Sequence, residues 1–399
     1  MTYNAHLFTT EGKETTDLSF LASKKIVYLV NVDWFFISHR LPLARAARDA
    51  GAEVIVAAGD TGKGVTLEKE GIHFVPLPFS RQGTSIFQES ITVHAIFNFL
   101  KRTKPDLLHT VSIKPVLYGS LLSRFFNAWP VVNAISGLGY VFSQKRKAAF
   151  LRHAVSRFYK MALGNPKSIT IFQNPSDMEI MLNAGLIRKE QMVLIRGSGV
   201  DCSKFIPSPF PENPVIMLPA RMLWDKGVAE FIRAAEILHP EFPNAKFVLV
   251  GPADDENPSA ISCETITEWT ASHSYLEWWG AKEPYEMPEV LAKTTIIALP
   301  SYHEGLPKVL LEAAACGRPI VTTDIPGCKE IVSHNTNGFL VPVHNAEALS
   351  HAMRLLLESH AKIEKMGQRG REIVCSDFIE EKVVSKTLDV YKTLFGKNQ

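Results

Sequence analysis

The sequence lacks any apolar stretch that approaches the ~20 residues a helix needs to cross a lipid bilayer. Its first 20 residues are polar and show no basic segment followed by an apolar one, so they do not resemble a signal peptide. No Gly-x-Gly-x-x-Gly segment follows a predicted first strand, which argues against a dinucleotide-dependent dehydrogenase. From these absences we expect neither a membrane-spanning helix nor a cleaved leader.

Cysteines are few, and their spacing shows no recognisable motif. The five cysteines are scattered, and no two of them form a Cys-x-x-Cys pair. An odd number without such pairs argues against a disulfide framework or a zinc site and favours a reducing cytoplasm. We therefore expect all five to be small buried hydrophobic side chains: Cys202, Cys263, Cys316, Cys328 and Cys375.

Charge is unevenly distributed between the two halves of the 399-residue chain. Residues 1–200 carry 24 Lys and Arg against 14 Asp and Glu, a net charge of +10, whereas the remaining residues carry 19 against 27. A basic first half favours an anionic partner such as a membrane surface, a phosphorylated lipid or a nucleic acid. The alternative is that surface charge differs between domains without functional meaning.

Short β-branched runs alternate with longer amphipathic stretches, which is typical of parallel α/β units. The predicted strands cover residues 26–30, 53–58, 107–111, 131–134 and 169–173, then 215–218, 246–250, 296–299 and 319–322. The predicted helices cover residues 40–50, 91–102, 145–163, 227–238, 288–293, 308–316 and 346–359. Residues 201–214 contain four prolines and are predicted to link the two series.

The pattern predicts an α/β protein with two doubly wound, Rossmann-like domains, residues 1–200 and 201–379. A length of 399 residues is comfortable for two cores. Ligands of such sheets bind at the carboxyl ends of the strands. Two facing domains would place these two edges across a shared central cleft.

The segment after the predicted strand 296–299 carries the strongest chemical signal. Glu304 and Gly305 lie in a loop, and Pro307 is preorganised for the first turn of a helix whose free N–H groups favour phosphate. Glu312 lies eight residues after Glu304, close to two helical turns, so both carboxylates are able to address one side. The alternative is one capping glutamate and one solvated glutamate.

A second segment places two cations after the predicted strand 215–218. Arg221 and Lys226 are five residues apart on a turn that leads into a helix, so both are able to reach one diphosphate. Arginine offers a planar fork of donors and lysine a point charge. Two ordinary surface cations at a strand end are the alternative.

Together these segments resemble glycosyltransferase family 4, a retaining family with the GT-B fold. Its marks are an Arg and a Lys after the first strand of the C-terminal domain and a Glu-x7-Glu motif later, here Arg221, Lys226, Glu304 and Glu312. Residues 197–201 resemble the family's interdomain Gly-Val-Asp element. The stretch from about residue 380 is similar to the terminal helix that packs back on the N-terminal domain in this fold.

The resemblance implies roles for a nucleotide-sugar site. Arg221 and Lys226 would neutralise the departing diphosphate, Glu304 would hold sugar hydroxyls, and Glu312 would hold the ribose. Backbone amides would bind phosphate or sugar along Gly305, Leu306, Pro307 and Lys308. Family members need no metal, and no Asp-x-Asp motif is present. We expect no metal and no cofactor, and front-face attack assisted by the leaving phosphate.

The N-terminal half departs from the common family pattern. No glycine occurs in residues 31–40 after the first strand, and Ser136-Gly137 stands where His-Gly is usual. Both departures resemble the bacterial capsule, O-antigen and N-glycan precursor branch, whose members extend sugars on a polyprenyl diphosphate. His109 is expected either to contact acceptor or to cap its strand. The candidate acceptor residues are Ser38, His39, Arg40, His109, Ser136 and Gly137.

Residues 144–160 interleave cations with apolar side chains, as in helices that lie on anionic membranes. An ordinary helix that packs its apolar face on the sheet is the alternative. The expected partners are a UDP-sugar, a polyprenyl-diphosphate-linked acceptor and the inner face of the plasma membrane, where a cytoplasmic enzyme would bind peripherally. No recognition motif for nucleic acid accompanies the basic half.

Sequence reasoning therefore favours transfer of a hexose or N-acetylhexosamine in bacterial surface polysaccharide or glycan assembly. One alternative is a nucleotide-sugar epimerase of the same fold, which would need histidines and carboxylates placed for proton abstraction. Another is an inactive subunit of a glycosylation complex, because fold does not guarantee activity.

Overall fold

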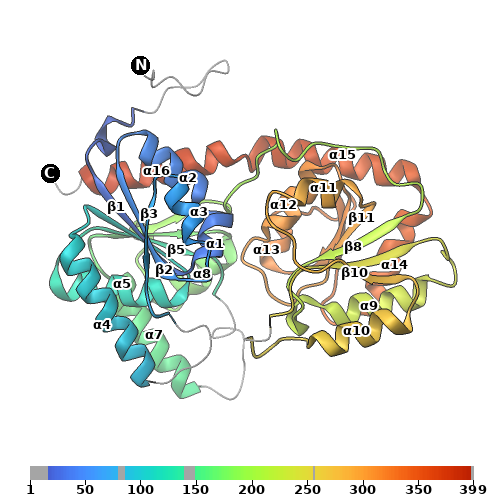
Figure 1. The fold of residues 1–399 in the computed structure, drawn as a ribbon, viewed down its shortest axis with the longest axis horizontal. Helices are drawn as coiled ribbons and strands as arrows, with labels where there is room; N and C mark the ends of the chain where they lie inside the picture. The colour runs from blue at the N-terminus through green and yellow to red at the C-terminus, as the bar shows by residue number, and fades with distance from the viewer. Residues whose placement is uncertain (1–16, 80–85, 139–148, 255–256, 397–399) are drawn as a thin grey trace. The chain divides into compact units, whose positions relative to one another are not determined.

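The computed structural model describes residues 17–79, 86–138, 149–254 and 257–396 (Figure 1). The chain divides into two compact units. The N-terminal unit contains Met1–Phe172, Asp177–Ile195 and Val383–Gln399, and the C-terminal unit contains Gln173–Ser176 and Arg196–Lys382. Each unit has one parallel sheet with helices on both faces, so the predicted pair of doubly wound α/β folds is confirmed.

The sheet of the N-terminal unit has the strand order β3-β2-β1-β4-β5-β6-β7, and every pairing is parallel. Its strands are β1 (Lys25–Val32), β2 (Glu53–Gly59), β3 (His73–Pro76), β4 (Leu107–Val111), β5 (Val131–Ile135), β6 (Ser168–Phe172) and β7 (Met192–Leu194). Every residue of β4, β5 and β6 is buried, because helices cover both faces of the sheet. The five predicted strands of this half are confirmed to within two residues at each end.

Helices cover this sheet in two layers. They are α1 (Asp33–His39), α2 (Leu41–Asp49), α3 (Gly64–Lys69), α4 (Ile86–Thr103), α5 (Ile113–Phe126), α7 (Ala149–Leu163), α8 (Pro175–Asn183) and α16 (Glu380–Gly396). Helices α1, α2 and α16 pack on the face that carries Tyr28 and Val30. Helices α4 and α5 pack on the face that carries Val27 and Leu29.

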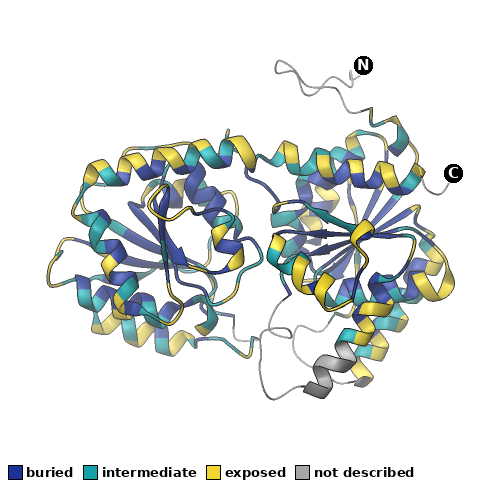
Figure 2. Cartoon of the chain, turned by 180° about the vertical axis from the view of Figure 1, so that it is seen from behind, coloured by how far each residue is buried: buried dark blue, intermediate teal, exposed yellow. Residues whose placement is uncertain are grey.

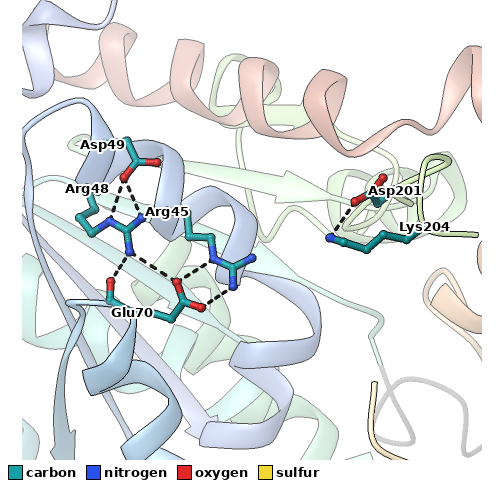
Figure 3. Close-up of polar contacts among 6 residues, drawn as sticks. All are labelled: Arg45, Arg48, Asp49, Glu70, Asp201 and Lys204. Atoms are coloured by element: carbon teal, nitrogen blue, oxygen red, sulfur yellow. Dashed lines mark hydrogen bonds and ion pairs between the residues drawn. The ribbon is translucent and has the colours of Figure 1, made fainter. Parts of the chain in front are cut away.

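The segment that follows β1 is not a glycine-rich loop of the kind common in the family. Residues 33–39 form helix α1 directly after the strand. Arg45 and Arg48 of the following helix α2 both bond to Glu70 in the turn before β3 (Figure 3). These ion pairs fasten α2 to the edge of the sheet. Burial opposes ionisation of Glu70, but the hydrogen bond from Arg45 is the larger influence and lowers the pKa of its carboxyl group.

The sheet of the C-terminal unit has the order β10-β9-β8-β11-β12-β13. Its strands are β8 (Val215–Pro219), β9 (Lys246–Val250), β10 (Leu276–Trp278), β11 (Ile296–Leu299), β12 (Ile320–Thr323) and β13 (Gly338–Val341). Its helices are α9 (Val228–Leu238), α10 (Cys263–Ser272), α11 (Met287–Ala292), α12 (Lys308–Ala315), α13 (Pro326–Lys329), α14 (Ala346–Leu357) and α15 (His360–Asp377). Helices α9 and α14 share one core, and α11, α12 and α15 share the core on the other face.

The proline-rich segment 201–214 belongs to the C-terminal unit, where Phe205 is buried in the core. Asp201 begins it with a turn in which its carboxylate accepts hydrogen bonds from Ser203 and pairs with Lys204 Nζ at 2.7 Å (Figure 3). Although partial burial raises the pKa of Asp201, the bonds from Lys204 and Ser203 outweigh it and lower the pKa overall.

The expectation for the cysteines is wrong for three of the five. Cys202 and Cys375 form a disulfide with a Cα–Cα distance of 6.0 Å, and Cys263 is exposed. Cys316 and Cys328 are free and buried, as expected. The disulfide was invisible in the sequence because its partners are 173 residues apart and meet only when the end of α15 packs on the start of the C-terminal unit.

Helix α16 completes the core of the N-terminal unit through a buried polar side chain. The hydroxyl group of Tyr391 lies 2.6 Å from Nδ1 of His109 on β4 and donates to the hydroxyl of Tyr28 on β1 at 3.1 Å. All three side chains are buried, and burial, with a smaller effect of the Arg40 charge, lowers the pKa of His109 well below its usual range. The imidazole is therefore neutral at pH 7, and the network fixes α16 on the sheet.

We expect Tyr391→Phe to lower the free energy of unfolding by about 1–2 kcal/mol, because it leaves His109 and Tyr28 without a partner in a buried site. The measurement is urea unfolding followed by circular dichroism. Tyr285→Phe is the matched control, because the Tyr285 side chain is 81% exposed. Equal unfolding midpoints for Tyr391→Phe and the wild type would show that this network does not stabilise the helix.

Candidate functional site

The strand order places a ligand edge in the C-terminal unit. From β8 the chain adds β9 and β10 on one side, and from β11 it adds β12 and β13 on the other. The order in which successive strands are added therefore reverses between the parallel neighbours β8 and β11. Such a switch point leaves a crevice at the carboxyl ends of the strands. Arg221 and Lys226 follow β8, and Glu304 follows β11, so three of the predicted residues flank this point.

The two loops at the switch point are fastened to each other. The short helix η3 (Trp224–Lys226) ends at Gly227, whose φ of 72° lies in the left-handed region. A Cβ atom at Gly227 would lie 2.2 Å from the carbonyl oxygen of Pro300, so only glycine allows this close approach. The backbone N–H of Tyr302 also donates to the carbonyl of Asp225 at 2.9 Å. The backbone thereby fixes where Lys226 meets Glu304.

Lys226 and Glu304 form an ion pair with Nζ and Oε1 2.6 Å apart. Their side chains are 17% and 13% exposed, so solvent screens the pair less than a surface pair. The hydroxyl group of Ser301 donates to the same carboxylate oxygen at 2.8 Å. Lys226 was predicted to bind the diphosphate and Glu304 to bind sugar hydroxyls. The ion pair joins these two residues, which are 78 positions apart in the chain.

Arg221 is paired in the same way. Its Nη1 donates to Oδ2 of Asp254 at 2.7 Å, and Asp254 is only 7% exposed. Asp254 follows β9 and was not identified from the sequence, although it lies at the carboxyl edge of the sheet next to the strand that precedes Arg221. A Cβ atom at Gly251 would lie 1.9 Å from the carbonyl oxygen of Ala220, so the two loops are in close contact.

The first turn of α12 supplies a third cation and carboxylate. Lys308 and Glu312 are one turn apart, with Nζ and Oε1 at 3.3 Å. Glu312 is buried, and burial raises the pKa of its carboxyl group while Lys308 opposes the shift. Pro307 is the residue before the helix rather than its first residue. The backbone N–H of Leu310 in the first turn donates to the carbonyl of Pro307 at 3.0 Å, and the start of a helix is a position that favours an anion.

The loop before α12 is held by contacts inside the C-terminal unit. The side-chain amide of Asn174 donates to the carbonyl of Gly305 at 3.1 Å. A Cβ atom at Gly327 would lie 2.5 Å from the carbonyl oxygens of both Glu304 and Gly305. Leu306 is a buried core residue, so its backbone alone is available to a ligand.

The acceptor candidates of the N-terminal unit are not brought together as one surface. Arg40 and His109 are buried. His109 lies in the middle of β4, so it does not cap the strand, and its side chain bonds to Tyr391 of α16. Burial also lowers the pKa of Arg40, whose Nη1 donates to the carbonyl of His39 at 3.1 Å. His39 stacks on Phe35 of the same helix α1, with ring centroids 4.1 Å apart, and Ser38 is half-buried beside it.

Ser136 and Gly137 directly follow β5 at the carboxyl edge of the sheet and are half-buried. Ser112, which the sequence did not single out, follows β4 at the switch point between β1 and β4. Its φ of 78° and ψ of 166° fall in a region that is almost restricted to glycine. Its position after a strand was the one sequence signal for this residue.

Part of the predicted basic helix, including Lys145, Arg146 and Lys147, lies outside the described residues. Where α7 is described, Tyr159 and Leu163 are buried against α5 and β6, whereas Phe158 is exposed. The described residues contain no helix long and apolar enough to span a membrane. They also contain no cluster of three His, Cys, Asp or Glu side chains that would bind a metal.

Two parallel α/β units, with cation–carboxylate pairs at the switch point of the second, define a protein of the GT-B class. The solved sucrose-phosphate synthase from Thermosynechococcus elongatus has this fold and superposes with a TM-score of 0.79 at 20% identity, covering 94% of this chain and all of the other. Residues 203–373 match the family described as glycosyl transferases group 1, and residues 25–174 match the one described as glycosyl transferase 4-like.

Curated relatives agree with these matches. An N,N'-diacetylbacillosaminyl-diphospho-undecaprenol alpha-1,3-N-acetylgalactosaminyltransferase from Campylobacter jejuni is 30% identical over 81% of this chain and 89% of its own length. A UDP-Gal:alpha-D-GlcNAc-diphosphoundecaprenol alpha-1,3-galactosyltransferase from Escherichia coli is 23% identical over 79% and 82%. The chain belongs to the group 1 glycosyltransferases with a family-4-like N-terminal part, and the predicted family is confirmed.

We expect Glu304→Gln to lower the free energy of unfolding by about 1–3 kcal/mol, because it leaves Lys226 poorly compensated in a site that is largely shielded from water. The double variant Lys226→Met with Glu304→Gln should recover part of this loss. Urea unfolding measures these two variants and Lys226→Met alone. Glu289→Gln is the matched control, because its pair with Lys293 is exposed and contributes little. Strictly additive effects of the two substitutions would show that the pair is not coupled.

The raised pKa of Glu312 gives a pH dependence of stability. The folded state binds the proton more tightly than the unfolded chain, so the contribution of Glu312 is fully present below the ordinary value of 4.5 and is lost as pH rises through the raised pKa. Glu312→Gln removes this loss, so its stability relative to the wild type should increase between pH 4.5 and 7.5. A constant difference in urea midpoints across this range would contradict the assignment.

Proposed function

We propose that the chain is a retaining glycosyltransferase that moves a hexose or N-acetylhexosamine from a UDP-sugar to a polyprenyl-diphosphate-linked saccharide in bacterial surface polysaccharide or glycan assembly. The observation that carries the proposal is the set of three cation–carboxylate pairs at the switch point of the C-terminal unit: Arg221–Asp254, Lys226–Glu304 and Lys308–Glu312. The Campylobacter jejuni and Escherichia coli relatives act on undecaprenyl-diphosphate-linked sugars, which supports the acceptor class.

The three pairs together supply cations for phosphate and carboxylates for hydroxyls. Arg221 and Lys226 neutralise the negative charge that grows on the departing diphosphate, and Glu304 accepts hydrogen bonds from sugar hydroxyls while it holds Lys226 in place. The amides of Gly305, Leu306 and Lys308 face phosphate or sugar, since Pro307 has no amide proton. Glu312 accepts from the ribose hydroxyls. UDP is favoured as the nucleotide because the Escherichia coli relative uses UDP-Gal.

Transfer needs no metal in this proposal, because side-chain cations supply the positive charge that a divalent ion would otherwise provide. The bond between the anomeric carbon and the phosphate oxygen breaks, and its electron pair stays on the phosphate. The acceptor oxygen bonds to the same face of the anomeric carbon, and its proton passes to that phosphate oxygen. UDP leaves, and the anomeric configuration is retained.

The N-terminal unit binds the acceptor in this proposal. Ser136 and Gly137 at the end of β5, and Ser38 and His39 on α1, are the contacts we assign to it. Arg40 and His109 do not touch the acceptor in this proposal, because both side chains are buried. They hold α1 and α16 in position instead. An acceptor on a polyprenyl diphosphate is anchored in a bilayer, which places the enzyme peripherally at the inner face of the plasma membrane.

The test is release of UDP from a panel of UDP- and GDP-sugars, with and without a polyprenyl-diphosphate sugar acceptor. We expect acceptor-dependent UDP release that EDTA does not change, and a loss in kcat/KM of about 100-fold or more in Arg221→Ala and Glu304→Ala. Arg233→Ala, which removes an exposed cation on α9, is the control and should retain activity.

Full activity in both site variants would overturn the site assignment. Acceptor-independent conversion of the UDP-sugar to its epimer would identify the epimerase alternative. Tight UDP binding without turnover over the whole panel would favour an inactive subunit. Inversion at the anomeric carbon, read from the product by NMR, would contradict the retaining mechanism while leaving the donor site intact.

A further inference from the structure

Exposed hydrophobic side chains gather on the helix layer formed by α4, α5 and α7. Phe125 and Phe126 at the end of α5 are 68% and 56% exposed, and Phe158 and Met161 on α7 are 50% and 37% exposed. Burial of such large apolar side chains is strongly favourable, so a cluster of them in water is unusual for a surface without a partner. Figure 1 shows the three helices side by side on one face of the sheet.

Contacts between neighbouring helices hold α4, α5 and α7 together in one layer. The ring of Phe126 lies 4.7 Å from that of Phe97 on α4, and Lys101 Nζ lies 5.8 Å from the centroid of Phe97. Arg124 on α5 donates to the carbonyl of Met161 on α7 at 2.7 Å. The three helices therefore meet near their C-terminal ends, where these groups form what we call the aromatic–basic face: Phe125, Phe126, Phe158, Met161, Lys101 and Lys160.

Charge on this layer is almost entirely positive. Arg102, Arg124 and Arg157 are exposed alongside Lys101 and Lys160. Glu89 is the one acidic residue on the three helices as far as they are described. Its carboxylate is half-buried and already paired with Lys114 at 2.6 Å and bonded to Tyr118. No exposed carboxylate on the described part of these helices therefore opposes an anionic partner.

The face lies away from the candidate acceptor residues. Exposed residues of the helices lie on the side away from the sheets, as the burial colours of Figure 2 show. Each of the three helices ends where the chain turns into the amino end of a strand, α4 into β4, α5 into β5 and α7 into β6. Docking through their outer surface leaves Ser112, Ser136 and Gly137 at the carboxyl edge uncovered.

We propose that the aromatic–basic face docks the N-terminal unit on an anionic lipid bilayer, with the phenylalanine rings in the headgroup region and the lysines among lipid phosphates. Amphipathic surfaces with aromatic side chains and flanking cations bind membranes by burial of apolar area and by attraction to anionic lipid. The inference rests on the proposed function only in that a polyprenyl-linked acceptor lies in a bilayer. The docking itself requires neither donor nor acceptor.

The test is co-sedimentation of the full chain with vesicles that contain no acceptor, either phosphatidylcholine alone or an equal mixture with phosphatidylglycerol. We expect binding to the mixed vesicles, which 0.5 M salt weakens, and a loss of affinity of about tenfold or more in Phe125→Ser with Phe126→Ser. Lys101→Glu with Lys160→Glu should weaken binding by a similar factor. Circular dichroism checks that each variant is folded.

Two matched controls locate the effect. Tyr285→Ser removes a more exposed aromatic ring of the C-terminal unit, and Lys365→Glu with Arg369→Glu makes the same change in net charge on α15. Both should bind the mixed vesicles like the wild type. Transfer to a short water-soluble acceptor should be unchanged in Phe125→Ser with Phe126→Ser, which separates docking from catalysis.

Equal sedimentation of the wild type and both face variants would overturn the proposal even if glycosyl transfer is found. So would equal binding to neutral and anionic vesicles. A lipid-independent dimer that Phe125→Ser with Phe126→Ser dissociates would identify a second copy of the chain as the occupant instead. Vesicle binding without transfer to any acceptor would leave the docking surface standing and refute the proposed function.

Discussion

The C-terminal unit depends on one electrostatic constraint, which is that positive charge gathered at the sheet edge has to be compensated while no ligand is present. Lys226 is largely shielded from solvent, and an unpaired charge in such a place costs several kcal/mol. Carboxylates from three different loops and helices meet this need, and two of them, Glu304 and Glu312, are also suited to sugar hydroxyls. In Glu304, stability and recognition are thus served by the same side chain.

This constraint explains the backbone around the site. Gly227 and Gly251 allow loops from neighbouring strands to approach within van der Waals contact, and Gly327 does the same beneath Glu304. Any Cβ atom at these positions would push the loops apart and lengthen the ion pairs. The glycines are therefore part of the charge arrangement, although none of them carries a functional group.

The sequence predicted those parts of the fold that follow from long buried patterns. The central strands β4, β9 and β11 are rich in apolar residues, and their predicted bounds agree with the structure. The edge strands β3, β7, β10 and β13 were missed because they are three or four residues long and most are partly exposed. Asp254 and the Cys202–Cys375 pair were missed because their partners are distant in sequence, and the family pattern pointed to the donor residues but not to what holds them.

The disulfide between Cys202 and Cys375 has a topological consequence. It closes residues 202–375, nearly the whole C-terminal unit, into a covalent ring from which only short segments lead to the other unit. A single backbone cut anywhere inside this ring would open it without separating the molecule into two pieces. The polypeptide on either side of such a cut stays joined through sulfur, so the oxidised chain would keep its mass in a denaturing gel until a reductant is added.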